Sequence, residues 1–170
     1  KISEDVVSVE SGVILRDLFL FLNKNNLSLY KYHELSVLSF LGCSVGGALS
    51  TGTHGSIRNG YGSFCSFIIE LKYIDGLGNI KIIDNTSKLF KYIICSLGQL
   101  CIIIEVKLKI LKKKPLYIKK IKMKTYNISM FDKNIFDFVK NNNNITRMEY
   151  THGDYIELVF DGLEDKNIKP

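Results

Sequence analysis

The chain has 170 residues, of which 46% are hydrophobic and 24% are charged, so it can form one packed domain and the beginning of a second. Its net charge of +6 comes mostly from lysine, and neither its three arginines nor any recognisable binding module indicates a nucleic-acid partner. No apolar run approaches the ~18 residues of a membrane span, and the polar start Lys1–Asp5 does not resemble a signal peptide.

In chain order, Val6 to Val9 predicts a short strand. Apolar residues at helical spacing from Ile14 to Leu22 predict a helix that stops at Asn25-Asn26. The segment Ser36 to Ser56 is rich in small residues and glycine and shows no clear periodicity. Apolar residues then alternate through Phe67 to Tyr73, which predicts a strand with Phe67, Ile69, Leu71 and Tyr73 on one face.

A turn over Asp75 to Asn79 leads into a second strand over Ile80 to Ile83. Thr86 to Ser96 predicts a short helix that ends at Gly98. The strongest strand pattern is Ile102 to Ile110, where Lys107 and Lys109 alternate with apolar residues. We interpret these lysines, which open the densest basic run of the chain, as the solvated face of a half-buried strand, the alternative being a general attraction for anionic ligands.

The character of the chain changes after Pro115, and we place a domain boundary at Lys112 to Pro115. Beyond it, Tyr117 to Thr125 predicts a strand and Met130 to Lys140 an amphipathic helix. Ile145 to Tyr150 and Tyr155 to Phe160 predict a hairpin. A β-α-β-β unit of this size buries little core by itself, so we interpret residues 114–170 as the opening of a second domain.

The four cysteines lie among apolar or small neighbours, and none forms a Cys-x-x-Cys pair. They are Cys43, Cys65, Cys95 and Cys101. We expect buried free thiols, which favours a reducing intracellular compartment and is compatible with a mitochondrial one. The three histidines are not spaced with these cysteines as metal ligands, so we expect no metal site.

The most informative segment is Ser44 to Ser56, which contains four glycines, several hydroxyl residues and no acidic side chain. Glycines let the backbone approach an anion closely, and successive N–H groups and hydroxyls can bind it, so the composition suits a pyrophosphate. The segment lacks the Lys of a P-loop and the glycine spacing of a dinucleotide-binding fingerprint. From the residues alone, a structural Gly-rich turn is an equal alternative.

Ser44 to Ser56 resembles the second FAD-contacting loop of the vanillyl-alcohol-oxidase type of flavoenzymes, in the group of the L-gulonolactone, D-arabinono-lactone and alditol oxidases. Three further stretches resemble this group in the same order: Val7 to Leu18, Gly60 to Gly76, and Ser96 to Ile103. The resemblance implies an α+β fold. Residues 1–113 would form an FAD-binding PCMH-type subdomain, a mostly antiparallel sheet with flanking helices. Residues 114–170 would begin a β-α-β-β substrate domain. We expect the family's other pyrophosphate-binding subdomain and most of the substrate domain to lie outside this chain, which alone should not turn over substrate.

The resemblance also assigns roles to single positions in binding FAD. The implied contact residues are Ser39, Ser44, Gly47, Thr51, Gly52, Thr53, His54 and Ile102. Thr51 to His54 would hold the pyrophosphate and ribityl region, and Ile102 would offer backbone hydrogen bonds near the adenine. Cys101 stands where the family has a glycine, which puts that approach in doubt. His54 could instead be a general base, but no carboxylate or nucleophile stands beside it in the sequence.

The implied reaction is hydride transfer from the CH–OH group of a small hydroxylated substrate to the flavin, which oxygen or an electron carrier then reoxidises. Arg147 and Glu149 faintly resemble part of the family's substrate domain and could serve proton transfer, the alternative being a cross-strand charge pair. Two other hypotheses remain: a degenerate relative that keeps the fold as a binding or structural module, and a Lys-rich interaction domain whose glycine segment is only a turn.

Overall fold

The fold was analysed in a computed structural model of the whole chain. It describes residues 1–29, 42–54, 63–113, 116–122, 137, 140–142, 145–151 and 155–161. The described residues up to Lys113 form one compact unit, and those from 116 onward form a second. No helix within these described segments is long and apolar enough to cross a membrane.

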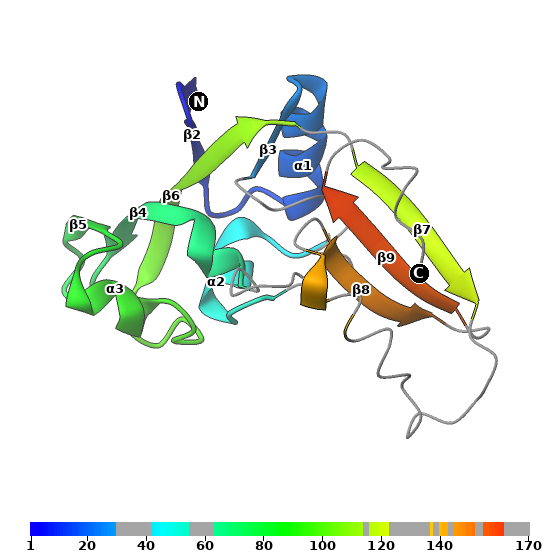
Figure 1. Cartoon of the computed structure of the whole chain (residues 1–170). Coiled ribbons are helices and arrows are strands. Elements are labelled where there is room, and N and C mark those ends of the chain that lie inside the picture. Colours follow the sequence, from blue (N-terminus) through cyan, green and yellow to red (C-terminus); the bar gives the residue numbers. More distant parts are fainter. Residues whose placement is uncertain are drawn as a thin grey trace. The chain divides into compact units, whose positions relative to one another are not determined.

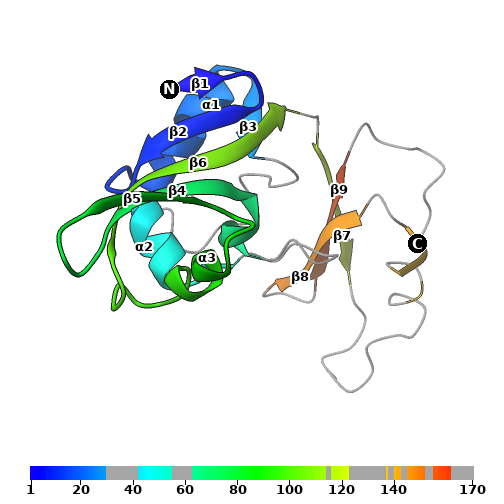
Figure 2. The same cartoon turned by 90° about the vertical axis from the view of Figure 1, so that its left-hand side faces the viewer.

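The first unit is built on an antiparallel sheet with the strand order β1-β2-β6-β4-β5, and β3 also pairs with β6 (Figures 1 and 2). Its strands are β1 (Ile2–Ser3), β2 (Val6–Glu10), β3 (Leu27–Leu29), β4 (Ile68–Ile74), β5 (Ile80–Asp84) and β6 (Ile102–Lys112). The long strand β6 is the centre, since it pairs with β2, β3 and β4. The strongest strand pattern in the sequence is therefore the strand on which the unit is assembled.

The two faces of β6 differ as its sequence predicts. Val106, Leu108 and Ile110 are at most 1% exposed, whereas Lys107 and Lys109 reach solvent. On that polar face Lys107 Nζ lies 2.8 Å from a Glu70 carboxylate oxygen. Glu70 raises the pKa of Lys107 by accepting this hydrogen bond and by its charge. The solvated-face interpretation of these two lysines is confirmed.

Three helices and a 3-10 turn pack beside the sheet. They are α1 (Leu15–Lys24), α2 (Val45–Ser50), η2 (Phe64–Phe67) and α3 (Lys88–Ile93). Helix α1 buries Leu15, Leu18, Phe19 and Leu22, the i, i+3, i+4, i+7 stripe that the sequence shows. It ends at Asn25, whose N–H and side-chain amide both donate to the carbonyl of Phe21. Helix α2 packs on β2 and β6 with Val45, Ala48 and Leu49 fully buried.

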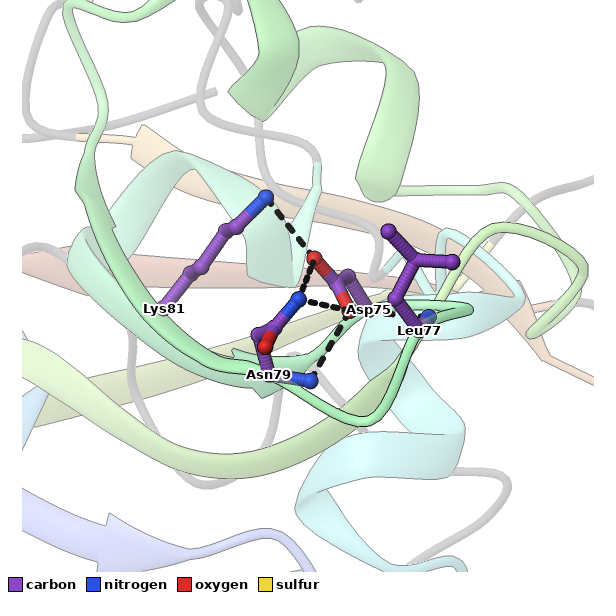
Figure 3. Close-up of polar contacts among 4 residues, drawn as sticks. All are labelled: Asp75, Leu77, Asn79 and Lys81. Atoms are coloured by element: carbon purple, nitrogen blue, oxygen red, sulfur yellow. Dashed lines mark hydrogen bonds and ion pairs between the residues drawn. The ribbon is translucent and has the colours of Figure 1, made fainter.

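The β4–β5 hairpin is closed by a turn centred on the Asp75 carboxylate (Figure 3). One Asp75 oxygen accepts from the N–H groups of Leu77 and Asn79, each at 2.9 Å. The other oxygen lies 2.7 Å from Lys81 Nζ. The ion pair with Lys81 and these N–H groups hold the pKa of Asp75 well below its usual range. The Asp-Gly turn signal thus corresponds to an Asx-type turn that fixes the hairpin.

The second unit contains a three-stranded antiparallel sheet with the order β7-β9-β8. Its strands are β7 (Leu116–Lys122), β8 (Ile145–Thr151) and β9 (Tyr155–Asp161). The pairing of β8 with β9 runs from Ile145 opposite Phe160 to Thr151 opposite Tyr155, so the expected hairpin pairing is confirmed. Most of the expected helix over Met130 to Lys140 lies outside the described residues.

The α+β class and the mostly antiparallel sheet are confirmed, and the structure corrects four local expectations. Helix α2 lies inside Ser36 to Ser56, where no periodicity was expected, and α3 is shorter than Thr86 to Ser96. In β4, a register shift between Ile68 and Glu70 buries Ile68 and leaves Ile69 half-buried, so the predicted alternation holds from Leu71 to Tyr73 but not at Ile69. Cys65 is a buried thiol, but Cys95 is exposed.

Candidate functional site

The site begins at Ser44, which caps the short helix α2. Its hydroxyl oxygen accepts from the N–H of Gly47 at 3.1 Å, and its carbonyl accepts from the N–H of Ala48 at 2.9 Å. Ser44 has an extended backbone, as an N-cap residue should. The chain then continues from α2 through Thr51, Gly52, Thr53 and His54. We call Ser44 to His54 the 44–54 segment.

The turn between β2 and α1 holds the start of the 44–54 segment. The N–H of Val45 donates to the carbonyl of Val13, and the N–H of Gly46 donates to that of Ser11, each at 2.8 Å. A Cβ added to Gly46 would lie 2.9 Å from Ser11 Cβ, closer than real Cβ atoms approach. Gly46 is therefore required because two backbones meet there.

The far end of the segment is held from two sides. The N–H of Phe64, at the start of η2, donates to the carbonyl of Thr53 at 2.9 Å, and His54 forms an isolated bridge with Ser63. On the other side, the N–H of Cys95 donates to the carbonyl of Leu49 at 3.0 Å. The N–H of Leu97 donates to that of Ser50 at 2.9 Å. The stretches before and after the segment, though distant in sequence, thus meet it in space.

Gly52 is the one glycine of the 44–54 segment with a positive φ, +65°. A Cβ at Gly52 would lie 2.5 Å from Cys95 Sγ. Both the backbone conformation and the sulfur beside it demand glycine at this position. The turn that supplies the sulfur is itself unusual, because Cys95, Leu97 and Gly98 all have positive φ.

The amide groups of the segment are already committed to the protein. The N–H groups of Val45, Gly46, Gly47, Ala48, Thr51, Gly52 and Thr53 all donate to protein oxygens. Residues 45–53 therefore do not form the concavity of free N–H groups that their composition predicts. The donors left for an anion are side chains: the hydroxyls of Ser44 and Thr53 and the ring of the exposed His54, since the Thr51 hydroxyl donates to Gly47.

Two threonine hydroxyls form a short relay. Thr51 Oγ1 donates to the carbonyl of Gly47 at 2.9 Å, and Thr53 Oγ1 lies 3.2 Å from Thr51 Oγ1. Since Thr51 has one hydroxyl proton and gives it to Gly47, Thr53 is the donor of the pair. A hydroxyl can rotate, so Thr53 can exchange this long hydrogen bond for a stronger, charge-assisted one to a phosphate oxygen.

The structure brings six of the predicted contact residues together: Ser44, Gly47, Thr51, Gly52, Thr53 and His54. Ile102 opens β6 opposite Ile74, beyond the turn that contacts α2, and its side chain is 68% exposed. Ser39 lies outside the described residues. Sequence reasoning missed the role of Cys95, because its contacts with Leu49 and Gly52 join residues more than 40 positions apart and leave no local sequence signal.

Arg147 and Glu149 both lie on β8, in the second unit, opposite Val159 and Glu157 of β9. The structure describes their backbone alone. Their assignment to proton transfer or to a charge pair stays a prediction. Among the residues that the structure describes, no group of three or more His, Cys, Asp or Glu side chains is gathered in the way that metal ligands are.

The chain was compared with known protein families and with characterised proteins. Residues 1–84 match the family described as FAD binding domain. These residues belong to an FAD-binding domain. The matched range contains the whole 44–54 segment and the turn of Ser11 to Leu15 that holds it. The predicted cofactor, FAD, is therefore confirmed, although the contribution of each side chain is not resolved by the match.

The chain is also similar to part of a longer protein. The chain is 30% identical over 105 residues to D-arabinono-1,4-lactone oxidase from Candida albicans. The aligned part is 61% of this chain and 18% of that protein. The expected resemblance to the lactone oxidase group is thus confirmed. The chain spans less than a fifth of the length of this relative.

The residues present fit the phosphate region of FAD. The 44–54 segment contains no acidic side chain, and its hydroxyls and imidazole are hydrogen-bond donors for phosphate oxygens. At Gly47 an added Cβ would approach Ser44 Oγ to 3.1 Å, so any larger residue would crowd one of these hydroxyls. When bound, FAD would supply the redox chemistry, and these residues would hold its phosphate region.

Proposed function

We propose that the protein containing this chain is an FAD-dependent oxidoreductase that oxidises a CH–OH group of a small hydroxylated substrate. The observation that carries the proposal is the meeting of three separate stretches, at Ser11 to Leu15, Ser63 to Cys65 and Cys95 to Leu97, around the hydroxyl-bearing 44–54 segment. A Gly-rich turn without a ligand would not need exposed threonine hydroxyls arranged in a relay.

In this proposal residues 1–113 are the second FAD-binding subdomain and residues 114–170 begin the substrate domain. Thr51, Thr53 and His54 hold the pyrophosphate and ribityl region, and Ser44 and Gly47 position the start of the segment. Ser39 and Ile102 complete the nucleotide contacts. None of these residues carries out the redox step, which belongs to the flavin.

The similarity to a D-arabinono-1,4-lactone oxidase favours a sugar lactone, with an alditol or a hydroxy acid as the alternatives. Oxygen or an electron carrier would accept the electrons from the reduced flavin. Arg147 and Glu149 are the candidates in this chain for moving the proton of the substrate hydroxyl.

The proposal is tested by mixing the full-length flavoprotein, under anaerobic conditions, with a panel of sugar lactones, alditols and hydroxy acids. We expect one class to bleach the visible flavin absorption, since hydride transfer reduces the flavin. Readmitted air should restore the absorption if oxygen is the acceptor. A protein that binds FAD but is reduced by none of the panel would be a binding module of the same fold, and the oxidoreductase proposal would be wrong.

A further inference from the structure

Two cysteines from different parts of the chain approach the same carbonyl group, that of Leu49 at the end of α2. Cys65 lies in η2, and its Sγ is 3.8 Å from the Leu49 oxygen. Cys95 lies in the turn after α3, and its N–H donates to the same oxygen at 3.0 Å. All four cysteines of the chain lie among the described residues, and no disulfide joins them.

The two thiols are also close to each other. Cys65 Sγ and the N–H of Cys95 lie against the same Leu49 carbonyl oxygen, and the neighbouring Cys95 thiol helps to raise the pKa of Cys65. Cys95 Sγ also lies beside Gly52, 2.5 Å from the position that a Cβ on this residue would occupy. Both sulfur atoms therefore stand beside the Leu49 to Gly52 part of the 44–54 segment.

The two thiols differ in their exposure to solvent, and this difference sets the order in which an oxidant meets them. Cys65 is 7% exposed, and burial, together with the neighbouring Cys95 thiol, raises its pKa to about 11. Cys95 is exposed to solvent. Its φ of +62° is an uncommon conformation for a residue other than glycine, and the hydrogen bond to Leu49 maintains it. An oxidant from solvent therefore meets Cys95 first, with Cys65 behind it.

We infer that Cys65 and Cys95 form a peroxide-responsive dithiol that closes to a disulfide beside the FAD-binding segment. In the first step the Cys95 thiolate attacks hydrogen peroxide, breaks the O–O bond and becomes a sulfenic acid, with release of one water. In the second step the Cys65 sulfur attacks the Cys95 sulfur, the S–O bond breaks, and a second water leaves. Two thiols and one peroxide thus give one disulfide and two waters.

The disulfide would connect η2 covalently to the turn that contacts α2. At present these two elements hold the 44–54 segment through backbone hydrogen bonds, from Phe64 to Thr53 and from Cys95 and Leu97 to Leu49 and Ser50. A cross-link between positions 65 and 95 restricts the unfolded chain and raises the unfolding temperature where the native geometry accepts it. This inference depends on the thiol geometry alone and stands or falls separately from the proposed oxidoreductase activity.

The test exposes reduced full-length protein to stoichiometric hydrogen peroxide, blocks remaining thiols with N-ethylmaleimide, and maps the peptides without reduction. Lys72 and Lys91 separate the two cysteines, so trypsin leaves them on different peptides. We expect a linked Cys65–Cys95 pair that dithiothreitol opens, and a higher unfolding temperature for the oxidised form. Cys95 and Cys101 share a tryptic peptide, so the mapping is repeated in Cys101→Ser, where the link should persist.

The matched variants are Cys95→Ser, at an exposed position, and Cys43→Ser, away from the pair. Cys95→Ser should abolish the link and Cys43→Ser should leave it intact. The inference is overturned if both cysteines are recovered blocked by N-ethylmaleimide, if Cys95 stops at a sulfinic acid, or if the link in wild type joins Cys101 or Cys43 instead. Because Cys95→Ser does not disturb a buried residue, its result does not depend on how well a Cys65 variant folds.

Discussion

At the scale of single residues, the glycines of the 44–54 segment are required for different reasons. The sequence predicts that this segment needs glycine, but it does not distinguish close approach from backbone conformation. Gly46 has ordinary dihedral angles and is needed because Ser11 lies against it. Gly52 is needed because its φ is positive and because a sulfur atom fills the space of a side chain. Only the three-dimensional structure distinguishes these two reasons for glycine, since both depend on residues distant in sequence.

Gly52→Ala should therefore destabilise the protein by more than backbone strain alone. An L-residue in the left-handed region costs about 1–2 kcal/mol, and the contact with Cys95 Sγ adds to it. The matched control is Gly78→Ala, which has a similar φ of +83° but no atom within 4 Å of the added Cβ. Chemical denaturation of the two variants measures the difference.

The contribution of the sulfur is isolated by repeating Gly52→Ala in a Cys95→Ala background, as a double-mutant cycle. There the substitution should cost about as much as Gly78→Ala. An unchanged cost in the two backgrounds would show that Cys95 does not fill this space.

The donors of the site were predicted only in part. The sequence indicates that hydroxyls and amides together would bind a phosphate, and the hydroxyls of Ser44, Thr51 and Thr53 are indeed placed on one segment. The amides are not free, because they donate to oxygens of the segment itself and to the carbonyls of Ser11 and Val13. Composition shows which groups exist, whereas the fold decides which are already paired.

At the scale of elements, the strands and α1 could be predicted because their apolar residues repeat at the period of the structure they form. Helix α2 was missed although Val45, Ala48 and Leu49 have helical spacing, because the two glycines between them suggest a loop. It is stabilised by packing on β2 and β6 and by the Ser44 cap rather than by helix propensity. Tertiary contacts of this kind have no signature in a local window.

The β4–β5 hairpin should lose stability in acid through Asp75. The pKa of this carboxyl is lowered in the folded state by Lys81 and the turn amides. A lowered folded-state pKa contributes stability that is fully present above the ordinary pKa of 3.8 and is lost as the pH falls below it. Thermal unfolding from pH 6 down to pH 3 should thus show a falling unfolding temperature for wild type.

The matched variant is Asp75→Asn, which keeps an oxygen acceptor for Leu77 and Asn79 but loses the charge opposite Lys81. It should be less stable than wild type at pH 6, and the gap between the two should narrow as the pH falls toward 3. A gap that stays constant across this range would mean that the charge of Asp75 contributes nothing to the hairpin.

At the scale of the whole molecule, the chain divides after Lys113, and the two units differ in how much of the function they can carry. The first contains the 44–54 segment, and its residues 1–84 match an FAD-binding domain. The sequence could predict this cofactor because four stretches matched one family in order. The sequence could not predict the substrate, because the chain spans only 18% of the relative that it resembles. A loop that binds FAD also carries little information about the compound that the flavin oxidises.

Binding of FAD by the 44–54 segment is tested most directly by the affinity of the full-length protein for FAD, measured by titration of the flavin-free form. Wild type should bind FAD and show the visible flavin bands. Thr53→Val, which removes one hydroxyl of nearly the same shape, should weaken binding by about tenfold, the equivalent of one hydrogen bond to a charged group. Thr86→Val, an exposed threonine in the turn after β5, should leave the affinity unchanged. A protein that takes up no FAD, or a Thr53→Val variant that binds it as tightly as wild type, would contradict the account.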